Sequence, residues 1–308
     1  MPSVSPPSIG IVTGATVPEL TSDGRALRSA LDDRGFDASA VRWDDPSTDW
    51  DCFDALCLRS CWEYHEDVDA FLAWLATVDA AGVQVFNRPR VVRWNVHKRY
   101  LLDLADAGAP VVPTAVVERG SDESLAAVAD RRDWTDVVVK PAVGTSSTGV
   151  WRTDRPGSPD ARRRFRDRLD AGDLLVQEFV PEIADGEYSF VFLRGTYSHA
   201  SRCVPADGAF RAHHTHGASS SPIVPQTTFT AQAKEVLDNA ADVLSIDPSD
   251  FVYARVDGVE RDGSLAVLEV ELIEPYLGLE RSDGGVDRFV DAFEAAFSSA
   301  TTTGVVGR

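Results

Sequence analysis

Short apolar runs alternate with amphipathic segments through the first ninety residues, and this order constrains the fold more than any other feature of the chain. Alternating strands and helices are typical of a parallel sheet with helices on its faces. We therefore expect a Rossmann-like α/β domain over residues 1–90. Its predicted strands are residues 8–13, 38–43, 54–59 and 83–86, and its predicted helices are residues 22–35 and 66–81.

Beyond residue 90 the pattern changes to an α+β order, in which hairpin-like pairs of strands are separated by single helices. We expect one domain at residues 91–178, with a leading helix at 87–108, and another at 179–308. Further helices are predicted at 121–131, 159–171, 230–244 and 286–299. Further strands are predicted at 111–117, 136–141, 150–152, 174–179, 187–193, 197–204, 251–259 and 264–273. Residues 205–222 are expected to form a loop, and residues from 301 onward a loose tail.

The chain is strongly acidic, with 49 Asp and Glu against 30 Lys and Arg and a net charge of −19. This charge repels nucleic acid and anionic membranes, and the sequence shows no concentrated basic patch to overcome it. Acids such as Asp32, Asp33 and Glu66 fall at expected surface positions, which resembles proteins that work in concentrated salt. A merely acidic protein from an ordinary environment is the alternative.

The cysteines and the hydropathy pattern indicate where the protein works. Cys52, Cys57, Cys61 and Cys203 lack paired CxxC spacing, and the first three fall in or beside an expected buried strand. We interpret them as core thiols in a reducing cytoplasm. The sequence has no run of 18 apolar residues and no signal-like start, so we expect no membrane partner.

The chain has only three lysines, and one of them, Lys140, lies where phosphates could be bound. Lys140 ends the apolar strand 137–139 and precedes a loop of small residues, Gly144–Gly149. Backbone N–H groups and hydroxyls in such a loop allow a polyphosphate to approach closely. The loop lacks the Gly-Lys-Ser/Thr of a Walker A motif, and an ordinary hairpin connection is the alternative.

A strand end at residues 174–180 could supply a nucleotide-base site. The backbone of Gln177, Glu178, Phe179 and Val180 could pair with an adenine edge, and Glu187 could accept hydrogen bonds from ribose hydroxyls. Glutamates on a solvated surface are the alternative interpretation.

Three acids near the C-terminus predict a metal site. Glu269 and Glu271 share one face of a strand because side chains alternate, and Asp257 lies on the preceding strand. Converging carboxylates repel one another unless a hard cation such as Mg²⁺ lies between them. The solvent face of an edge strand is the alternative.

Taken together, these motifs resemble the ATP-grasp ligases. The resemblance rests on Arg93-Trp94-Asn95 with Lys98, on Val139-Lys140-Pro141 through Gly149, and on Glu269 to Pro275. Within the family the chain is most similar to the subgroup of the cycloserine-biosynthesis cyclo-ligase and of RimK-like and glutathione-synthetase-like ligases. The resemblance implies an ATP-grasp fold at residues 91–308, preceded by the Rossmann-like domain.

The resemblance also implies roles for single residues. Lys98 and Lys140 would contact ATP phosphates beneath the loop containing Gly144, Ser146, Ser147 and Gly149. Arg211 and Arg255 would hold the transferring phosphoryl group, and Asp257, Glu269 and Glu271 would bind Mg²⁺ or Mn²⁺. Many members carry Asn at the position of Glu271, so the extra charge departs from the family pattern.

The implied reaction joins a small carboxylate to an amine through an acyl phosphate, with release of ADP and phosphate. Arg59, Trp62 and Tyr64 follow the third strand at its carboxyl end, where parallel sheets bind ligands, and are candidates for the substrate. A structural turn with a buried Trp is the alternative for them. A small-molecule phosphotransferase and a nucleotide-binding module without turnover are the rival functions, and a homodimer is left open.

The acidic surface predicts that salt stabilises the fold. Raising KCl from low to molar concentration should raise the melting midpoint, because screening removes repulsion among the surplus carboxylates. A thermal melt followed by circular dichroism at both salt concentrations measures this. An unchanged midpoint would contradict it.

Overall fold

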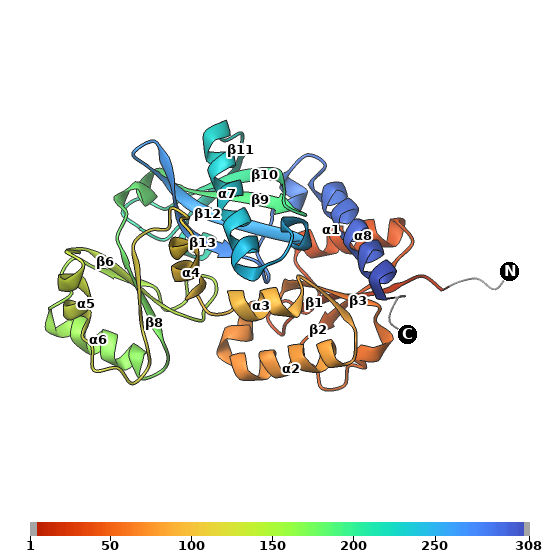
Figure 1. Cartoon of the computed structure of the whole chain (residues 1–308), viewed down its shortest axis with the longest axis horizontal. Coiled ribbons are helices and arrows are strands. Elements are labelled where there is room, and N and C mark those ends of the chain that lie inside the picture. The colour runs from red at the N-terminus through yellow and green to blue at the C-terminus, as the bar shows by residue number, and fades with distance from the viewer. Residues whose placement is uncertain (1–4, 305–308) are drawn as a thin grey trace.

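The computed structural model describes residues 5–304, except for the side chains of His214 and of residues 301–304. Within that range the strands form three sheets, each in its own lobe (Figure 1). Each sheet falls inside one of the expected domains, whose boundaries stay a prediction. No described helix is both long enough and apolar enough to cross a membrane.

The N-terminal sheet is parallel, as the alternating pattern predicted. It has the order β2-β1-β3-β4, and every neighbouring pair runs in the same direction. Its strands are β1 (Ser8–Thr13), β2 (Asp37–Arg42), β3 (Ala55–Ser60) and β4 (Gln84–Phe86). Its helices are α1 (Ser22–Asp33) and α2 (Val68–Ala80). Thr21 begins α1 by accepting a hydrogen bond from the Gly24 amide, which satisfies a free donor at the helix start.

The second sheet is antiparallel and has the order β5-β8-β6-β7. Its strands are β5 (Thr114–Val117), β6 (Val137–Pro141), β7 (Trp151–Thr153) and β8 (Leu174–Glu178). Two helices, α5 (Leu125–Arg131) and α6 (Pro159–Leu169), share one apolar cluster with these strands. The expected compact α+β unit is therefore present.

The third sheet is antiparallel and has the order β11-β10-β9-β12-β13. Its strands are β9 (Glu187–Leu193), β10 (Thr196–Val204), β11 (Ser219–Ile223), β12 (Tyr253–Arg261) and β13 (Ser264–Glu271), with the helices α7 (Thr227–Leu244) and α8 (Gly285–Gly304). The expectation of a plain loop at 205–222 was wrong, because β11 lies there. Its residues are almost all exposed serines and a proline, so it has no apolar alternation to reveal it.

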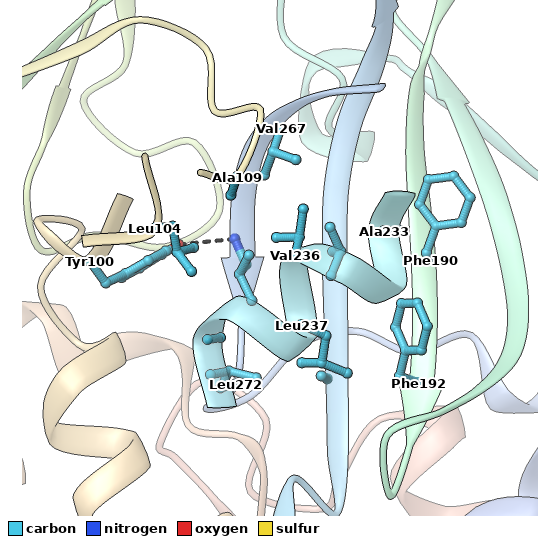
Figure 2. Packing of buried hydrophobic residues seen from close by; sticks show 14 of the residues in the cluster. Tyr100, Leu104, Ala109, Phe190, Phe192, Ala233, Val236, Leu237, Val267 and Leu272 are labelled. Carbon is cyan, nitrogen blue, oxygen red and sulfur yellow. Dashed lines mark hydrogen bonds between the residues drawn. The ribbon is translucent and has the colours of Figure 1, made fainter. Parts of the chain in front are cut away.

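The helix expected at 87–108 is two helices, α3 (Pro89–Asn95) and α4 (Tyr100–Asp106). The break has a cause in tertiary structure, since the Lys98 amide donates to the Ala142 carbonyl at 2.8 Å instead of continuing the helix. Figure 2 shows Tyr100 and Leu104 of α4 packed in the apolar cluster shared with α7 and the third sheet. The predicted leading helix of the second domain thus packs against the third sheet.

The C-terminal helix was expected to end at 299, with a loose tail from 301, but α8 continues to Gly304. The rest of that tail, residues 305–308, lies outside the described residues. α8 lies beside α1 (Figure 1), and Phe289 and Phe293 of α8 share an apolar cluster with Ile9 of β1 and Leu27 of α1. The last helix therefore completes the core of the first sheet.

The four cysteines follow the expectation of core thiols only in part. Cys57 and Cys61 are fully buried, and burial raises the pKa of the Cys57 thiol to about 12. Cys52 is exposed and Cys203 is half-buried, so the expectation was wrong for these two. Cys52 lies in a short helical turn before β3 and not in the strand.

One hydroxyl joins the first and third sheets. Tyr253 is fully buried, and its Oη lies 2.9 Å from the Leu58 carbonyl oxygen, 2.9 Å from that of Phe86 and 2.8 Å from that of Ile273. These carbonyls belong to β3, to β4 and to the segment after β13. The hydroxyl therefore fixes the position of one sheet relative to the other.

Tyr253→Phe should destabilise the protein by about 1 to 3 kcal/mol, because buried carbonyl oxygens lose their donor. Urea unfolding of the variant beside wild type measures this. Tyr197→Phe is the matched control, since Tyr197 is only half-buried. An equal loss in both variants would contradict the role assigned to the Tyr253 hydroxyl.

Candidate active site

A cavity of about 900 Å³ lies where the three sheets meet. Its walls include Thr16 from the N-terminal domain, Lys140 from β6 of the second sheet, and Glu269 from β13 of the third. Cavities of this size hold nucleotide-sized ligands. Most of the predicted site residues line it, namely Trp62, Tyr64, Lys98, Lys140, Gly144, Ser146, Ser147, Gln177, Glu178, Phe179, Val180, Glu187, Arg211, Arg255, Asp257, Glu269 and Glu271.

The two lysines enter the cavity in different electrostatic states. Lys98 forms an ion pair with Glu269 and donates a hydrogen bond to the Gly144 carbonyl at 2.9 Å. Lys140 is 9% exposed, and no ion pair or hydrogen bond joins its ammonium group to the described chain. Burial lowers the pKa of Lys140, although Glu269 opposes the shift. Lys140 is therefore a buried cation that lacks a fixed anion.

Arg255 on β12 is bound to two of the predicted metal ligands. Its Nε lies 2.9 Å from Asp257 Oδ1, and its Nη2 lies 2.9 Å from Asp257 Oδ2 and 2.6 Å from Glu271 Oε1. The strand register explains this contact, because Arg255 pairs with Glu271 and Asp257 pairs with Glu269. The two carboxylates raise the pKa of Arg255, which stays a cation despite its burial.

The cavity wall carries more carboxyl groups than cationic side chains. Burial, with Asp257 next, raises the pKa of Glu187 well above its usual range, and burial raises that of Glu271 to about 8. Burial would also raise the pKa of Glu269, but Lys98 and Lys140 hold it below its usual value. We name the mutually interacting side chains the charge cluster. It has five carboxylates, Glu187, Asp257, Glu269, Glu271 and Glu274, and three cations, Lys98, Lys140 and Arg255.

The chemistry of these donors suits a hard divalent cation, because all are oxygens and the carboxyl groups outnumber the neighbouring cations. Their arrangement does not yet form a metal site. Among the described residues, no three His, Cys, Asp or Glu side chains gather so that they could hold an ion. Lys98 and Arg255 occupy the oxygens of Glu269, Asp257 and Glu271 instead.

The small-residue loop lies against the N-terminal domain. Thr145 donates a hydrogen bond from its hydroxyl to the Trp62 carbonyl at 2.7 Å, and Ser146 and Ser147 adopt positive φ of 53° and 56°. Gly149 lies outside the residues that line the cavity, although Thr148 and Val150 beside it line it, and its contact with a nucleotide stays a prediction. Gly149 has a φ of 77°, and a Cβ there would lie 3.0 Å from the Pro141 side chain, so its role is to close the turn.

The expected base-binding segment is less free than its sequence indicated. The amides of Glu178 and Phe179 donate to the carbonyls of Pro113 and Asp136, each at 3.0 Å. The Glu178 carboxylate pairs with Arg261 at 3.0 Å, and the buried side-chain amide of Gln177 donates to the Thr114 hydroxyl. The prediction of free donors was therefore wrong for residues 178 and 179. Among the described residues the Val180 amide donates no such hydrogen bond, whereas the Val180 carbonyl accepts one from the Ile183 amide at 3.2 Å.

Five consecutive carbonyls after β13 each accept a hydrogen bond from a different side chain. We name residues 273–277 the strap. Its carbonyls accept, in order, from Tyr253, Trp62, Arg59, Arg255 and His199, at 2.8, 3.1, 2.7, 2.8 and 2.7 Å. These donors come from both the first and third sheets and from the turn after β3. The strap's backbone is therefore fixed residue by residue at the cavity wall.

The strap corrects the prediction for Arg59. Its guanidinium is 5% exposed, donates to the Pro275 carbonyl, and lies 5.0 Å from the ring centre of Tyr253. It does not line the cavity, so it is a structural cation and not a ligand for a substrate carboxylate. Trp62 and Tyr64, the other candidates from that turn, do line the cavity.

Sequence reasoning missed several cavity residues, among them His199, Glu274 and Arg281. Glu274 was visible only as the acid before Pro275 at the end of the carboxylate strand. A signal was present, since Glu274 follows two apolar residues, Leu272 and Ile273, whose burial places it inside the protein.

The chain is similar to proteins of known activity. A family model described as the N-terminal domain of D-cycloserine synthetase DcsG matches residues 9–87. Cycloserine biosynthesis protein DcsG of Streptomyces lavendulae is 34% identical over 304 residues, covering 92% of this chain and 97% of that protein. The crystal structure of D-cycloserine synthetase DcsG has a TM-score of 0.85 and 33% identity, covering 94% of this chain and 99% of that one. A D-alanine–D-alanine ligase from Bacillus anthracis, at a TM-score of 0.68 and 14% identity over 96% and 99% of the two chains, shares the fold.

Arg255→Met should destabilise the ligand-free protein by about 3 kcal/mol, because it leaves the nearly buried Asp257 and its neighbour Glu271 without a cation. Adding Glu271→Asn to that variant should recover part of the loss. Urea unfolding measures both effects.

Arg261→Met is the matched control for this prediction. Its pair with Glu178 is about one-third exposed on each side, so its loss should cost less than about 1 kcal/mol. If both variants lost the same free energy of unfolding, the buried ion pairs of Arg255 would stabilise the protein no more than the exposed pair of Arg261 does.

Proposed function

Since the chain belongs to the DcsG family of ATP-grasp ligases and is an ATP-dependent C–N ligase, we propose that it activates a small amino-acid carboxylate as an acyl phosphate. An amine then displaces phosphate and forms the amide. The observation that carries this proposal is the contrast within the cavity between Lys140, a buried cation without an anion, and the surplus of carboxylates around Lys98 and Arg255.

Lys140 and Lys98 are proposed to bind the phosphates of ATP. A triphosphate supplies the anion that Lys140 lacks, so its binding offsets the cost of burying that ammonium group. The loop at 144–148 covers the same place, since Lys98 donates to the Gly144 carbonyl. Val180 and Glu187 are the proposed contacts for the base and the ribose, and Arg211 is proposed to contact the transferring phosphoryl group.

Asp257, Glu269 and Glu271 are proposed to hold Mg²⁺ or Mn²⁺. When bound, the ion would neutralise charge on the phosphate oxygens. Its binding requires Lys98 and Arg255 to release these carboxylates, and both cations would then be available to the phosphoryl group and to the acyl phosphate. Positioning and charge neutralisation account for catalysis without a nucleophilic side chain.

The substrate is proposed to be a small amino acid derivative that closes on itself or joins a second amine. The similarity to D-cycloserine synthetase over nearly the whole chain supports a ring-forming reaction. Trp62 and Tyr64 would line the substrate end of the cavity. Four unpaired cysteines support a cytoplasmic location, and the charge of −19 supports work at high salt.

The function is tested by incubating the protein with ATP, Mg²⁺ and a panel of D- and L-amino acids and their side-chain amide and ureido derivatives. Release of ADP is measured, and products are identified by mass spectrometry. Amide formation with stoichiometric ADP supports the proposal. A stable phosphorylated product without an amide would replace it with a phosphotransferase.

Lys140→Met should weaken ATP binding roughly 10- to 100-fold, as expected for loss of a hydrogen bond between charged groups. The melting midpoint should stay equal or rise, because the variant no longer buries an unpaired charge. Calorimetric titration with ATP and a thermal melt give the two readouts. Lys234→Met, on the surface of α7, is the control and should change neither.

Glu269→Gln should abolish Mg·ATP turnover while the folded circular dichroism spectrum is kept. Treating wild type with EDTA should likewise stop ADP release, and added Mg²⁺ should restore it. Normal turnover in the variant would remove Glu269 from the proposed metal ligands.

A further inference from the structure

Glu274, the strap residue before Pro275, is a buried acid that the functions proposed above do not use. Its side chain lines the cavity, and the residue is 6% exposed. Within the described chain, its own backbone N–H is the one hydrogen-bond donor to its carboxylate, and no cation lies within ion-pairing distance. Burial raises the pKa of the Glu274 carboxyl to about 7, so near neutral pH a cationic partner would favour its charged form. An acid that lines a cavity and has no ion-pair partner in the described chain can receive that partner from a ligand.

The position of Glu274 places it between the substrate end of the cavity and the phosphate loop. Its carbonyl accepts from Trp62 Nε1 at 3.1 Å, and the Trp62 carbonyl accepts from the Thr145 hydroxyl at 2.7 Å. Burial and then the charge of Glu274 raise the pKa of the Tyr64 hydroxyl, so this carboxylate lies near Tyr64. The strap holds the backbone of Glu274 in place from both sides.

The charges around Glu274 show which kind of ligand it can take. Lys98 is bound to Glu269, and Arg255 is bound to Asp257 and Glu271, so neither pairs with Glu274. A triphosphate would draw both cations further away from the acids. A positively charged group of the ligand could therefore pair with Glu274 when the cavity is filled.

The walls favour an organic cation over a second metal ion at this position. No three metal-ligating side chains gather among the described residues, whereas Trp62 and Tyr64 line the cavity beside Glu274. Aromatic rings attract ammonium groups, while divalent cations require several oxygen ligands.

We propose that Glu274 binds the ammonium group of the amino-acid substrate and so selects carboxylates that carry one. This inference rests on the proposed ligase function and adds a residue that determines specificity. Glu274 holds the nitrogen end of the substrate, while the lysines and Arg255 face the phosphorylated carboxylate.

The test uses hydroxylamine to trap the acyl phosphate as a hydroxamate. Two amino acids, D-serine and D-alanine, are compared with analogues that lack the amino group, 3-hydroxypropionate and propionate. Wild type should use the amino acids with a kcat/KM roughly 10- to 100-fold higher, the range for a hydrogen bond to a charged group. Glu274→Gln should raise the KM of the amino acids by a similar factor, with the KM for ATP and the kcat/KM of the analogues unchanged.

Glu280→Gln is the matched control, because Glu280 is an exposed acid in the same part of the chain. The Glu280→Gln variant should keep the wild-type ratio of kcat/KM between each amino acid and its analogue without the amino group. Glu274→Asp keeps the charge, so its KM for the amino acids should lie between those of wild type and Glu274→Gln. Melting midpoints of the variants equal to that of wild type exclude a folding defect. Two results would overturn the inference while leaving the ligase function in place. In one, Glu274→Gln still prefers the amino acids over the analogues as strongly as wild type does. In the other, wild type uses each amino acid and its analogue equally well.

Failure of the ligase function gives a different result, in which no carboxylate yields a hydroxamate or ADP. Calorimetric binding of D-serine in the presence of ADP then decides the inference alone. Binding that is lost in Glu274→Gln and kept in Glu280→Gln supports it, and absence of binding by wild type overturns it.

Discussion

The crowding of acids and cations in one cavity is the constraint on which the rest of the site depends. Five acidic and three cationic side chains line the same cavity, so removing one partner of an ion pair there leaves a charge uncompensated. The ligand-free protein pairs Lys98 with Glu269 and Arg255 with Asp257 and Glu271. Under the proposed function, these pairs would compete with the phosphates for the cations and with the metal ion for the acids. The same contacts thus stabilise the empty protein and compete with binding.

The strap connects this electrostatic arrangement to the fold. Its carbonyls accept hydrogen bonds from side chains of the first and third sheets, and the strap follows directly from the strand that carries Glu269 and Glu271. A shift of the first sheet would therefore move Glu274 relative to Glu269 and Glu271. Arg59, which does not line the cavity, fixes the backbone at Pro275 beside Glu274.

Patterns within short segments could be predicted from the sequence, whereas pairings between distant segments could not. Alternation of apolar runs was sufficient for the parallel N-terminal sheet, and the two lysines and most of the small-residue loop chosen from the sequence line one cavity. The break at Lys98 and the loss of free donors at Glu178 depend on partners more than forty residues away in the chain. The serine-rich β11 has no apolar pattern, so it forms only because β10 offers a free edge. The sequence places Arg255 and Glu271 on adjacent predicted strands. Their ion pair could be predicted only with the register of these strands, which the structure supplies.

The packing of α8 against the first sheet has a consequence for synthesis. Phe289 and Phe293 fill a core whose other members, such as Ile9 and Leu27, leave the ribosome more than 260 residues earlier. Until the final helix emerges, the N-terminal lobe exposes an apolar face, and closing so long a loop is entropically slow. The nascent chain therefore depends on its last segment to bury its first, and a protein shortened at the C-terminus would present that sticky face to chaperones and proteases.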